Sequence, residues 1–191
     1  MMVETEHTPN PNTLKFLPGK KVSEVGPIEF LKNDKNIKVS LANKILSLEG
    51  TLMVFFGKDF ITVKKEKDLN WEDLKHGIIS EINDYYSKGY DVVVGKYLRL
   101  AKILNESASD SKTIQSNEII NKINEVLDSK IRPAVARDGG DITFKSFADG
   151  VVMVELKGSC SGCPSSIMTL KQGVQNLMCH YIPEVKSVEA I

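Results

Sequence analysis

The fold of the second half of this chain is set by the stretch GSCSGCPSS at residues 158–166. It lies between a predicted strand, Val151 to Lys157, and a predicted helix that begins at Pro164. Cys160 and Cys163 form a C-x-x-C pair, and the spacing allows both sulfur atoms to point at one metal ion or cluster. The pattern therefore predicts a strand, a metal-binding loop and a helix in succession.

The loop is expected to favour thiolates. Gly158 and Gly162 give it a permissive backbone, and small flanking residues leave backbone N–H groups free to bond to metal-bound sulfur. Since Pro164 suits the first position of a helix, Cys163 should lie at the partially positive helix N-terminus, where a thiolate is stabilised.

Two cysteines are only half of a metal site. A closed zinc site or a cubane cluster normally takes about four protein ligands. The other two could be Cys179 with a histidine, a small-molecule thiol, or the same loop of a second copy. We favour the second copy, because a two-fold dimer brings two identical loops face to face. Such a site would be exposed and easily opened.

The elements around the loop predict a small α+β domain. The turn Asp138-Gly139-Gly140-Asp141 precedes a hairpin, Ile142 to Phe147 and Val151 to Lys157, closed by Asp149-Gly150. A helix before the turn and a helix after the loop have apolar faces, and Pro133 should kink or end the first one. With a last strand from Val185 to Ile191, the prediction is a three-stranded sheet with two helices on one face.

A polar, serine-rich stretch at residues 105–112 reads as a linker between two domains. We place an N-terminal domain at 1–90, a linker region at 91–116 and a C-terminal domain at 117–191. The N-terminal half also has mixed helix and strand periodicity, so the whole chain is predicted to be α+β. Its predicted elements are a strand at 13–17, a helix at 41–48, a hairpin at 51–56 and 60–64, and a helix from Trp71 to Tyr85.

Composition limits the partners and the compartment. The chain has 25 basic and 25 acidic residues, so it lacks the positive surplus that nucleic acid or an anionic membrane requires. Its three cysteines do not form a secreted disulfide framework, which indicates a reducing compartment. Met1 to Pro11 shows neither a secretory signal nor an arginine-rich transit peptide. We therefore expect a protein of the bacterial cytoplasm with no nucleic-acid or membrane partner.

Several segments together resemble a known family. In the C-terminal half they are IRP at 131–133, DGGD at 138–141, GSCSGCPSS at 158–166, TLK at 169–171 and YIPEV at 181–185. These resemble the NifU C-terminal, or Nfu, domain. In the N-terminal half TPNPNTLKF at 8–16, DFITV at 59–63 and Trp71 look like the N-terminal domain that accompanies it in Nfu proteins.

The resemblance implies an iron-sulfur cluster scaffold or carrier rather than an enzyme. Two chains would share a 4Fe-4S cluster, or alternatively a 2Fe-2S cluster, through Cys160 and Cys163 of each. The cluster-bound form would be a homodimer. Its partners would be upstream cluster-assembly machinery, which loads the cluster, and apo iron-sulfur client proteins, which receive it.

A thiol-disulfide oxidoreductase that uses the C-x-x-C pair is the main alternative. Redox motifs of that kind follow a βαβ unit, whereas this one follows a hairpin, so we rank it second. Cys179 is interpreted as a small apolar residue, and Asp138 and Asp141 as turn residues. His7, His76 and His180 lack metal-ligand spacing to one another. A phosphate-binding glycine loop and a Ser-His-Asp set are not visible in the sequence, which gives ATP hydrolysis and acyl transfer no support.

Overall fold

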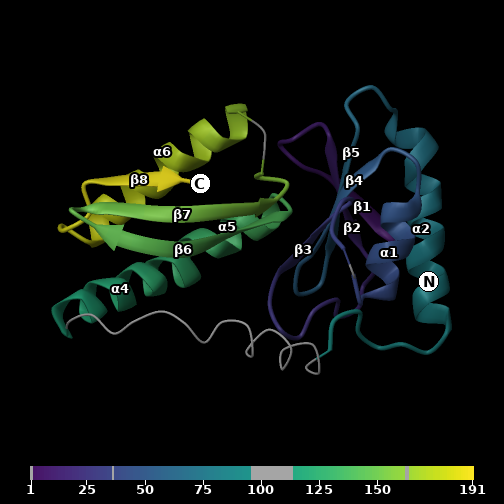
Figure 1. Cartoon of the computed structure of the whole chain (residues 1–191), viewed down its shortest axis with the longest axis horizontal. Coiled ribbons are helices and arrows are strands. Elements are labelled where there is room, and N and C mark those ends of the chain that lie inside the picture. Colours follow the sequence, from purple (N-terminus) through teal and green to yellow (C-terminus); the bar gives the residue numbers. More distant parts are fainter. Residues whose placement is uncertain (1, 36, 96–113, 162–163) are drawn as a thin grey trace. The chain divides into compact units, whose positions relative to one another are not determined.

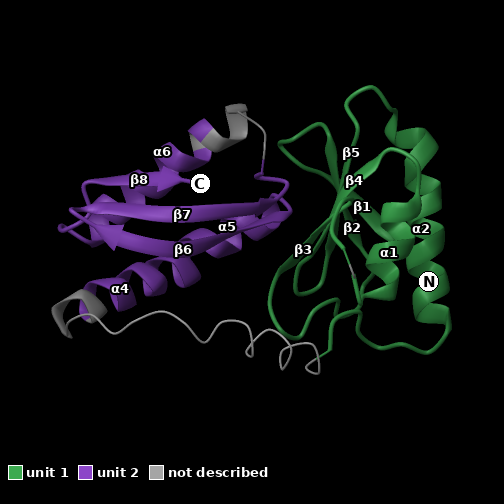
Figure 2. Cartoon of the chain, in the orientation of Figure 1, with its two compact units in different colours: residues 1–107 green, residues 108–191 purple. Residues whose placement is uncertain are grey.

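The chain forms two compact units, residues 1–107 and residues 108–191 (Figure 2). The computed structural model describes residues 2–35, 37–95, 114–161 and 164–191. Both units combine helices with a sheet, so the predicted α+β class with two domains is confirmed (Figure 1). Most of the predicted linker region, 91–116, lies outside the described residues, and the limits 1–90, 91–116 and 117–191 stay a prediction.

The first unit is a five-stranded antiparallel sheet with two helices packed against it (Figure 1). The strand order is β1-β2-β5-β4-β3. Its elements are β1 (Glu4–His7), β2 (Thr13–Leu17), β3 (Ile28–Leu31), α1 (Ser40–Ser47), β4 (Thr51–Phe56), β5 (Ile61–Lys65) and α2 (Trp71–Ser87).

The core of the first unit lies between the sheet and the two helices. Ile45 of α1 and Ile78 and Ile82 of α2 are fully buried there against strand residues such as Phe56 and Val63. Their helical spacing is what the sequence predicted for α2.

The first unit extends past residue 90. Val93 and Val94 are buried in its core, and both donate backbone N–H bonds to the carbonyl oxygen of Val22, at 3.1 and 2.9 Å. Part of the region assigned to a linker is therefore folded.

The second unit is a three-stranded sheet of order β6-β7-β8 with helices packed on it, as predicted. Asp149 and Gly150 both have positive φ, 53° and 86°, and close the hairpin between its two long strands. The last strand pairs parallel with its neighbour. The elements are α4 (Ile114–Val126), a π-helical segment (Leu127–Ile131), α5 (Arg132–Arg137), β6 (Gly140–Ala148), β7 (Val151–Gly158), α6 (Pro164–Tyr181) and β8 (Ser187–Ala190).

The helix before the turn changes its hydrogen-bonding pattern just ahead of Pro133. The π-helical segment separates α4 from α5, and Pro133 lies in the first turn of α5, where its missing N–H costs nothing. Ile123, Leu127 and Ile131 still point into one core with Val135. The irregular segment thus accommodates the proline and keeps the apolar face continuous.

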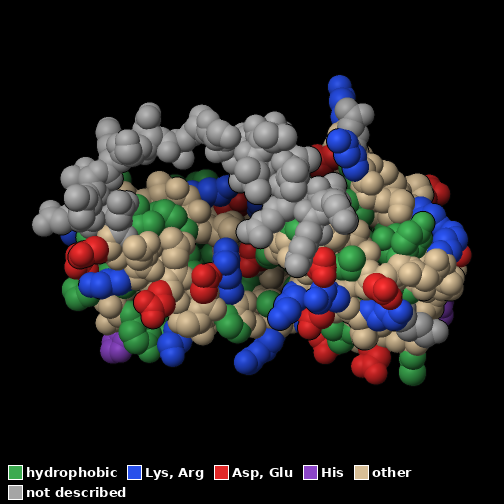
Figure 3. Space-filling view, turned by 90° about the horizontal axis from the view of Figure 1, so that it is seen from below, with side chains coloured by type: hydrophobic (Ala, Val, Ile, Leu, Met, Phe, Trp, Pro, Cys, Tyr) green, Lys and Arg blue, Asp and Glu red, His purple; other side chains and the backbone are tan. Residues whose placement is uncertain are grey.

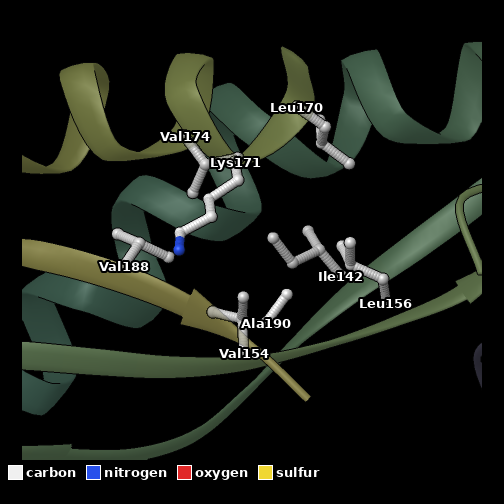
Figure 4. Close-up of a pocket in the computed structure, with 8 residues that line it drawn as sticks. All are labelled: Ile142, Val154, Leu156, Leu170, Lys171, Val174, Val188 and Ala190. Carbon is white, nitrogen blue, oxygen red and sulfur yellow. The ribbon is translucent and has the colours of Figure 1, made fainter. Parts of the chain in front are cut away.

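A small apolar cavity lies between α6 and the sheet of the second unit (Figure 4). Its volume is about 10 Å³, at the lower limit for one water molecule. Figure 4 shows Lys171 lying across it, and the lysine ammonium bonds to the Glu189 carboxylate at 2.6 Å. The lining residues are Ile142, Val154, Leu156, Leu170, Lys171, Val174, Val188 and Ala190. This side of α6 is therefore close-packed, with one small void.

Acidic and basic side chains alternate over the visible surface. Blue and red groups are intermixed on the face shown in Figure 3. Across the described part of the chain, none of the helices has the length and apolar character needed to cross a membrane.

Candidate metal centre

The site lies at the end of the hairpin where β6 starts and β7 ends. Gly140 and Gly158 are register partners in this hairpin, so the turn before β6 and the loop after β7 lie side by side. Gly139 and Gly158 have positive φ, 81° and 70°, a conformation that L side chains rarely adopt. The glycines of both segments let the chain turn sharply at this end of the sheet.

Cys160 is buried at this point, with 5% of its surface exposed, and it belongs to the core of the second unit. The sequence predicted an exposed site shared by two copies, and in the single chain the Cys160 part of that site is buried. The preceding residue fixes the loop, because the Ser159 N–H donates to the Gly139 carbonyl at 3.2 Å and the Ser159 hydroxyl donates to the Asp138 carbonyl. Ser161 instead bonds within the loop, with its hydroxyl 2.8 Å from the Gly158 carbonyl oxygen.

The thiol form of Cys160 is favoured in the metal-free chain. Burial raises the pKa of this thiol, a hydrogen bond between Cys160 Sγ and the Ser159 hydroxyl, 3.8 Å apart, lowers it, and the negative charges of Asp138 and Asp141 raise it further. The expectation of a thiolate-stabilising loop thus fails for Cys160. A bound cation reverses this balance, because metal coordination deprotonates a thiol outright.

Gly140 leaves room for the Cys160 sulfur. A Cβ atom added at Gly140 would lie 2.8 Å from Cys160 Sγ and 2.6 Å from the Lys157 carbonyl oxygen, where ordinary contacts are 3.4–4 Å. The sulfur therefore rests against a backbone that carries no side chain, and the absence of a Cβ is a requirement of the packing.

Arg132 of α5 forms an ion pair and a hydrogen bond with the first residues of β6. Asp141 is buried, its carboxylate lies 3.4 Å from Arg132 Nε, and the same Nε donates to the Ile142 carbonyl at 2.9 Å. Arg132 also bonds to Asp128, at 2.7 Å. Burial raises the pKa of Asp141, while the Arg132 guanidinium lowers it. These contacts attach α5 to the first residues of β6, a structural role.

The structure describes only one of the two predicted ligands. Cys163 lies outside the described residues. Cys179 is half-buried against the second core, and the His180 ring packs edge-on against Tyr181. Within the described ranges, no group of three or more His, Cys, Asp or Glu side chains could hold a metal ion.

Sequence reasoning missed the neighbours that hold Cys160. Ser159 and Gly140 act through contacts between segments about 20 residues apart, which depend on the hairpin register, and Arg132 contacts Asp141 and Ile142 at the start of β6. The only signal in the sequence was the pair of glycine-rich turns at the two ends of the predicted hairpin. That pairing would have placed Gly140 beside Gly158.

The donor chemistry fits an iron-sulfur cluster. Cys160 offers a single sulfur, a soft ligand suited to iron-sulfur clusters, and the glycine-rich surroundings let a bulky group approach the backbone closely. With one or two sulfur ligands per chain, the arrangement can bind part of a cluster and can exchange it by replacement of one thiolate by another.

Two family models match the chain. One is described as NifU-like domain and matches residues 123–189, and the other is described as Scaffold protein Nfu/NifU N terminal and matches residues 3–89. The chain belongs to the Nfu family of iron-sulfur cluster scaffold proteins. The recognition made from the sequence is confirmed.

Relatives of this Nfu chain are similar along its whole length. It is 42% identical to the human protein named NFU1 iron-sulfur cluster scaffold homolog, mitochondrial, covering 100% of this chain and 72% of that protein. It is also 42% identical to NifU-like protein 4, mitochondrial, of Arabidopsis thaliana, covering 99% of this chain and 65% of that protein. Among solved structures, a NifU-like protein from Saccharomyces cerevisiae matches with 27% identity and a TM-score of 0.46, covering 50% of this chain and 86% of that one.

These relatives correct one prediction and weaken another. A bacterial cytoplasmic location is contradicted, because the human and Arabidopsis relatives are named as mitochondrial proteins. The scaffold family gives the thiol-disulfide oxidoreductase alternative no support.

Proposed function

We propose that this Nfu chain carries a 4Fe-4S cluster between two copies, ligated by Cys160 and Cys163 of each, and transfers it to apo iron-sulfur proteins. The observation that supports this most is the fixed position of the Cys160 sulfur at the hairpin end, in a family of cluster scaffolds. The functional parts in this proposal are an N-terminal domain, assigned to 1–90 and continued in the structure by Val93 and Val94, a linker within 91–116, and a C-terminal cluster domain at 117–191.

The shared cluster follows from ligand number. A cubane cluster takes four thiolates, and the loop of one chain contributes two. A two-fold dimer supplies the other pair from the identical loop, which makes cluster binding and dimerisation one equilibrium. The homodimer is therefore expected when the cluster is present.

Transfer is a ligand exchange. A client thiolate forms a bond to one iron while the bond from that iron to a scaffold cysteine breaks, and the released sulfur takes a proton. Four such exchanges move the cluster without any change in its oxidation state, so the proposed role needs no catalytic residue. Upstream assembly machinery would load the cluster by the same exchange in reverse.

Anaerobic reconstitution of the full chain with ferrous iron and sulfide tests the proposal. A brown dimer with about two iron and two labile sulfide per chain is expected for one shared 4Fe-4S cluster, and about one of each would indicate a shared 2Fe-2S cluster. The loaded protein should then restore activity to an apo 4Fe-4S enzyme in the presence of an iron chelator that captures free iron. A colourless protein without labile sulfide would contradict the proposal and favour a zinc or thiol-redox role.

A further inference from the structure

The two serines that flank Cys160 make different hydrogen bonds. Ser159 reaches across to the turn before β6, where its hydroxyl donates to the carbonyl of Asp138, 21 residues away in the sequence. Its backbone N–H donates to the next carbonyl, that of Gly139, at 3.2 Å. Ser161 uses both its N–H and its hydroxyl on one nearby carbonyl, that of Gly158, at 3.2 and 2.8 Å. The Ser159 bonds thus join the cysteine loop to the turn before β6, while these two Ser161 bonds stay within the loop.

The turn that receives these bonds is itself firmly held. Gly140 begins β6 and pairs with Gly158, and Asp141 is tied to Arg132 on α5. Ser159 is 1% exposed, so its bonds are protected from competing water. A loop fastened to this turn therefore takes its position from the sheet and from α5.

We propose that Ser159 is a positioning residue for the Cys160 ligand. Its two bonds to the turn keep the Cys160 sulfur in the space that Gly140 leaves open, so that each chain presents one rigidly held sulfur to the cluster. This inference rests on the proposed function, in which Cys160 is a cluster ligand. It predicts that the Ser159 hydroxyl slows loss of the cluster, although it does not touch the cluster.

The cluster-bound full chain gives the first test. Ser159→Ala should lose its cluster to an iron chelator about 3- to 10-fold faster than the wild type, as expected for the loss of one buried hydrogen bond. Ser161→Ala removes a hydroxyl from the same loop and should stay within about 2-fold of the wild type, since the bond it removes, to the Gly158 carbonyl, is local to the loop. Equal rates for Ser159→Ala and the wild type, or equal acceleration in both variants, would overturn the proposal.

The metal-free chain gives a second test that does not depend on a cluster. In a Cys163→Ser background, Cys160 and Cys179 are the remaining thiols; Cys160 is buried in the core of the second unit and Cys179 is half-buried against it. Alkylation by iodoacetamide, followed by mass spectrometry of each peptide, reports their accessibility separately. Ser159→Ala should accelerate alkylation of Cys160 several-fold and leave Cys179 unchanged.

Comparing the alkylation rates of Cys160 and Cys179 distinguishes local positioning by Ser159 from a general loss of stability. If Ser159 only stabilises the fold, both cysteines will react faster in the Ser159→Ala variant, and the proposal is wrong. If the wild type takes up no cluster, the proposed function fails, while the alkylation ratio still decides whether Ser159 holds Cys160. Unchanged alkylation of Cys160 would refute the role of Ser159 whatever the cluster does.

Discussion

Gly140→Ala is the substitution for which the structure gives the most definite magnitude. The new methyl group would lie 2.6 Å from the Lys157 carbonyl oxygen and 2.8 Å from Cys160 Sγ. One of these neighbours is backbone of the paired strand, which cannot rotate away. Forcing an extra methyl group into such packing costs about 1–3 kcal/mol. The smaller entropy of the unfolded alanine chain offsets about 0.4–1 kcal/mol of this.

The net expectation is that Gly140→Ala destabilises the second unit by about 1–2 kcal/mol, or roughly 5–10 °C in melting temperature for a domain of this size. Urea unfolding of the full chain measures this loss of stability, and the transition of the first unit is the internal control. Trp71, the single tryptophan, lies in the first unit, so its fluorescence transition should stay in place while the circular dichroism transition of the second unit moves to lower urea.

Gly173→Ala is the control for replacing a glycine of the second unit by alanine. Gly173 lies in α6, and a Cβ added there meets no heavy atom within 4 Å. Gly173→Ala should therefore stabilise the second unit, by about 0.5–1 kcal/mol, because alanine favours the helix. If Gly140→Ala were as stable as the wild type and kept the reactivity of Cys160 unchanged, the argument that the sulfur needs the missing Cβ would be refuted.

Two further predictions concern the cores. Val174→Ala enlarges the cavity under α6 and should cost about 1–3 kcal/mol by urea unfolding, whereas Val151→Ala, at a half-buried strand position, should cost clearly less. Burial raises the pKa of Tyr86 to about 12, and its hydroxyl donates to the Lys21 carbonyl at 3.1 Å. Because the unfolded tyrosine ionises near pH 10, the wild type should lose stability between pH 10 and 12. Tyr86→Phe should be about 0.5–1.5 kcal/mol less stable at pH 8, and the gap should narrow above pH 10 in Trp71 fluorescence titrations. A stability difference between the wild type and Tyr86→Phe that stayed constant from pH 8 to pH 12 would contradict the raised pKa of Tyr86.

The elements with strong local signals were predictable from the sequence. Asp149-Gly150 between two β-rich runs specifies a hairpin, and the structure has it with both residues at positive φ. The spacing of apolar residues in α2 predicted a helix from Trp71, which is where it begins.

The two edge strands of the first unit were not predicted. β1 is mostly exposed, and its sequence, ETEH, has no apolar alternation. β3 has only four residues and follows Pro27. Each is held by hydrogen bonds to one neighbouring strand, so tertiary pairing decides its conformation and local sequence carries little signal.

The sequence supplied the candidate ligands, which stay a prediction, but it did not supply their surroundings. The spacing of Cys160 and Cys163 and the resemblance to the Nfu family identified the candidate thiols. The burial of Cys160, and hence the raised pKa of its thiol, depends on the register of the hairpin, which places Gly140 against the sulfur. Contacts between distant segments cannot be read from spacing alone.

The most direct measurement of the central claim is the iron content per chain of reconstituted wild type, Cys160→Ser, Cys163→Ser and Cys179→Ser, each with its mass in solution. We predict a dimer with about two iron per chain for the wild type and for Cys179→Ser, and no stable cluster in either of the other two variants. A full cluster retained by Cys160→Ser or Cys163→Ser, or its loss in Cys179→Ser alone, would contradict the assignment of the shared site to Cys160 and Cys163.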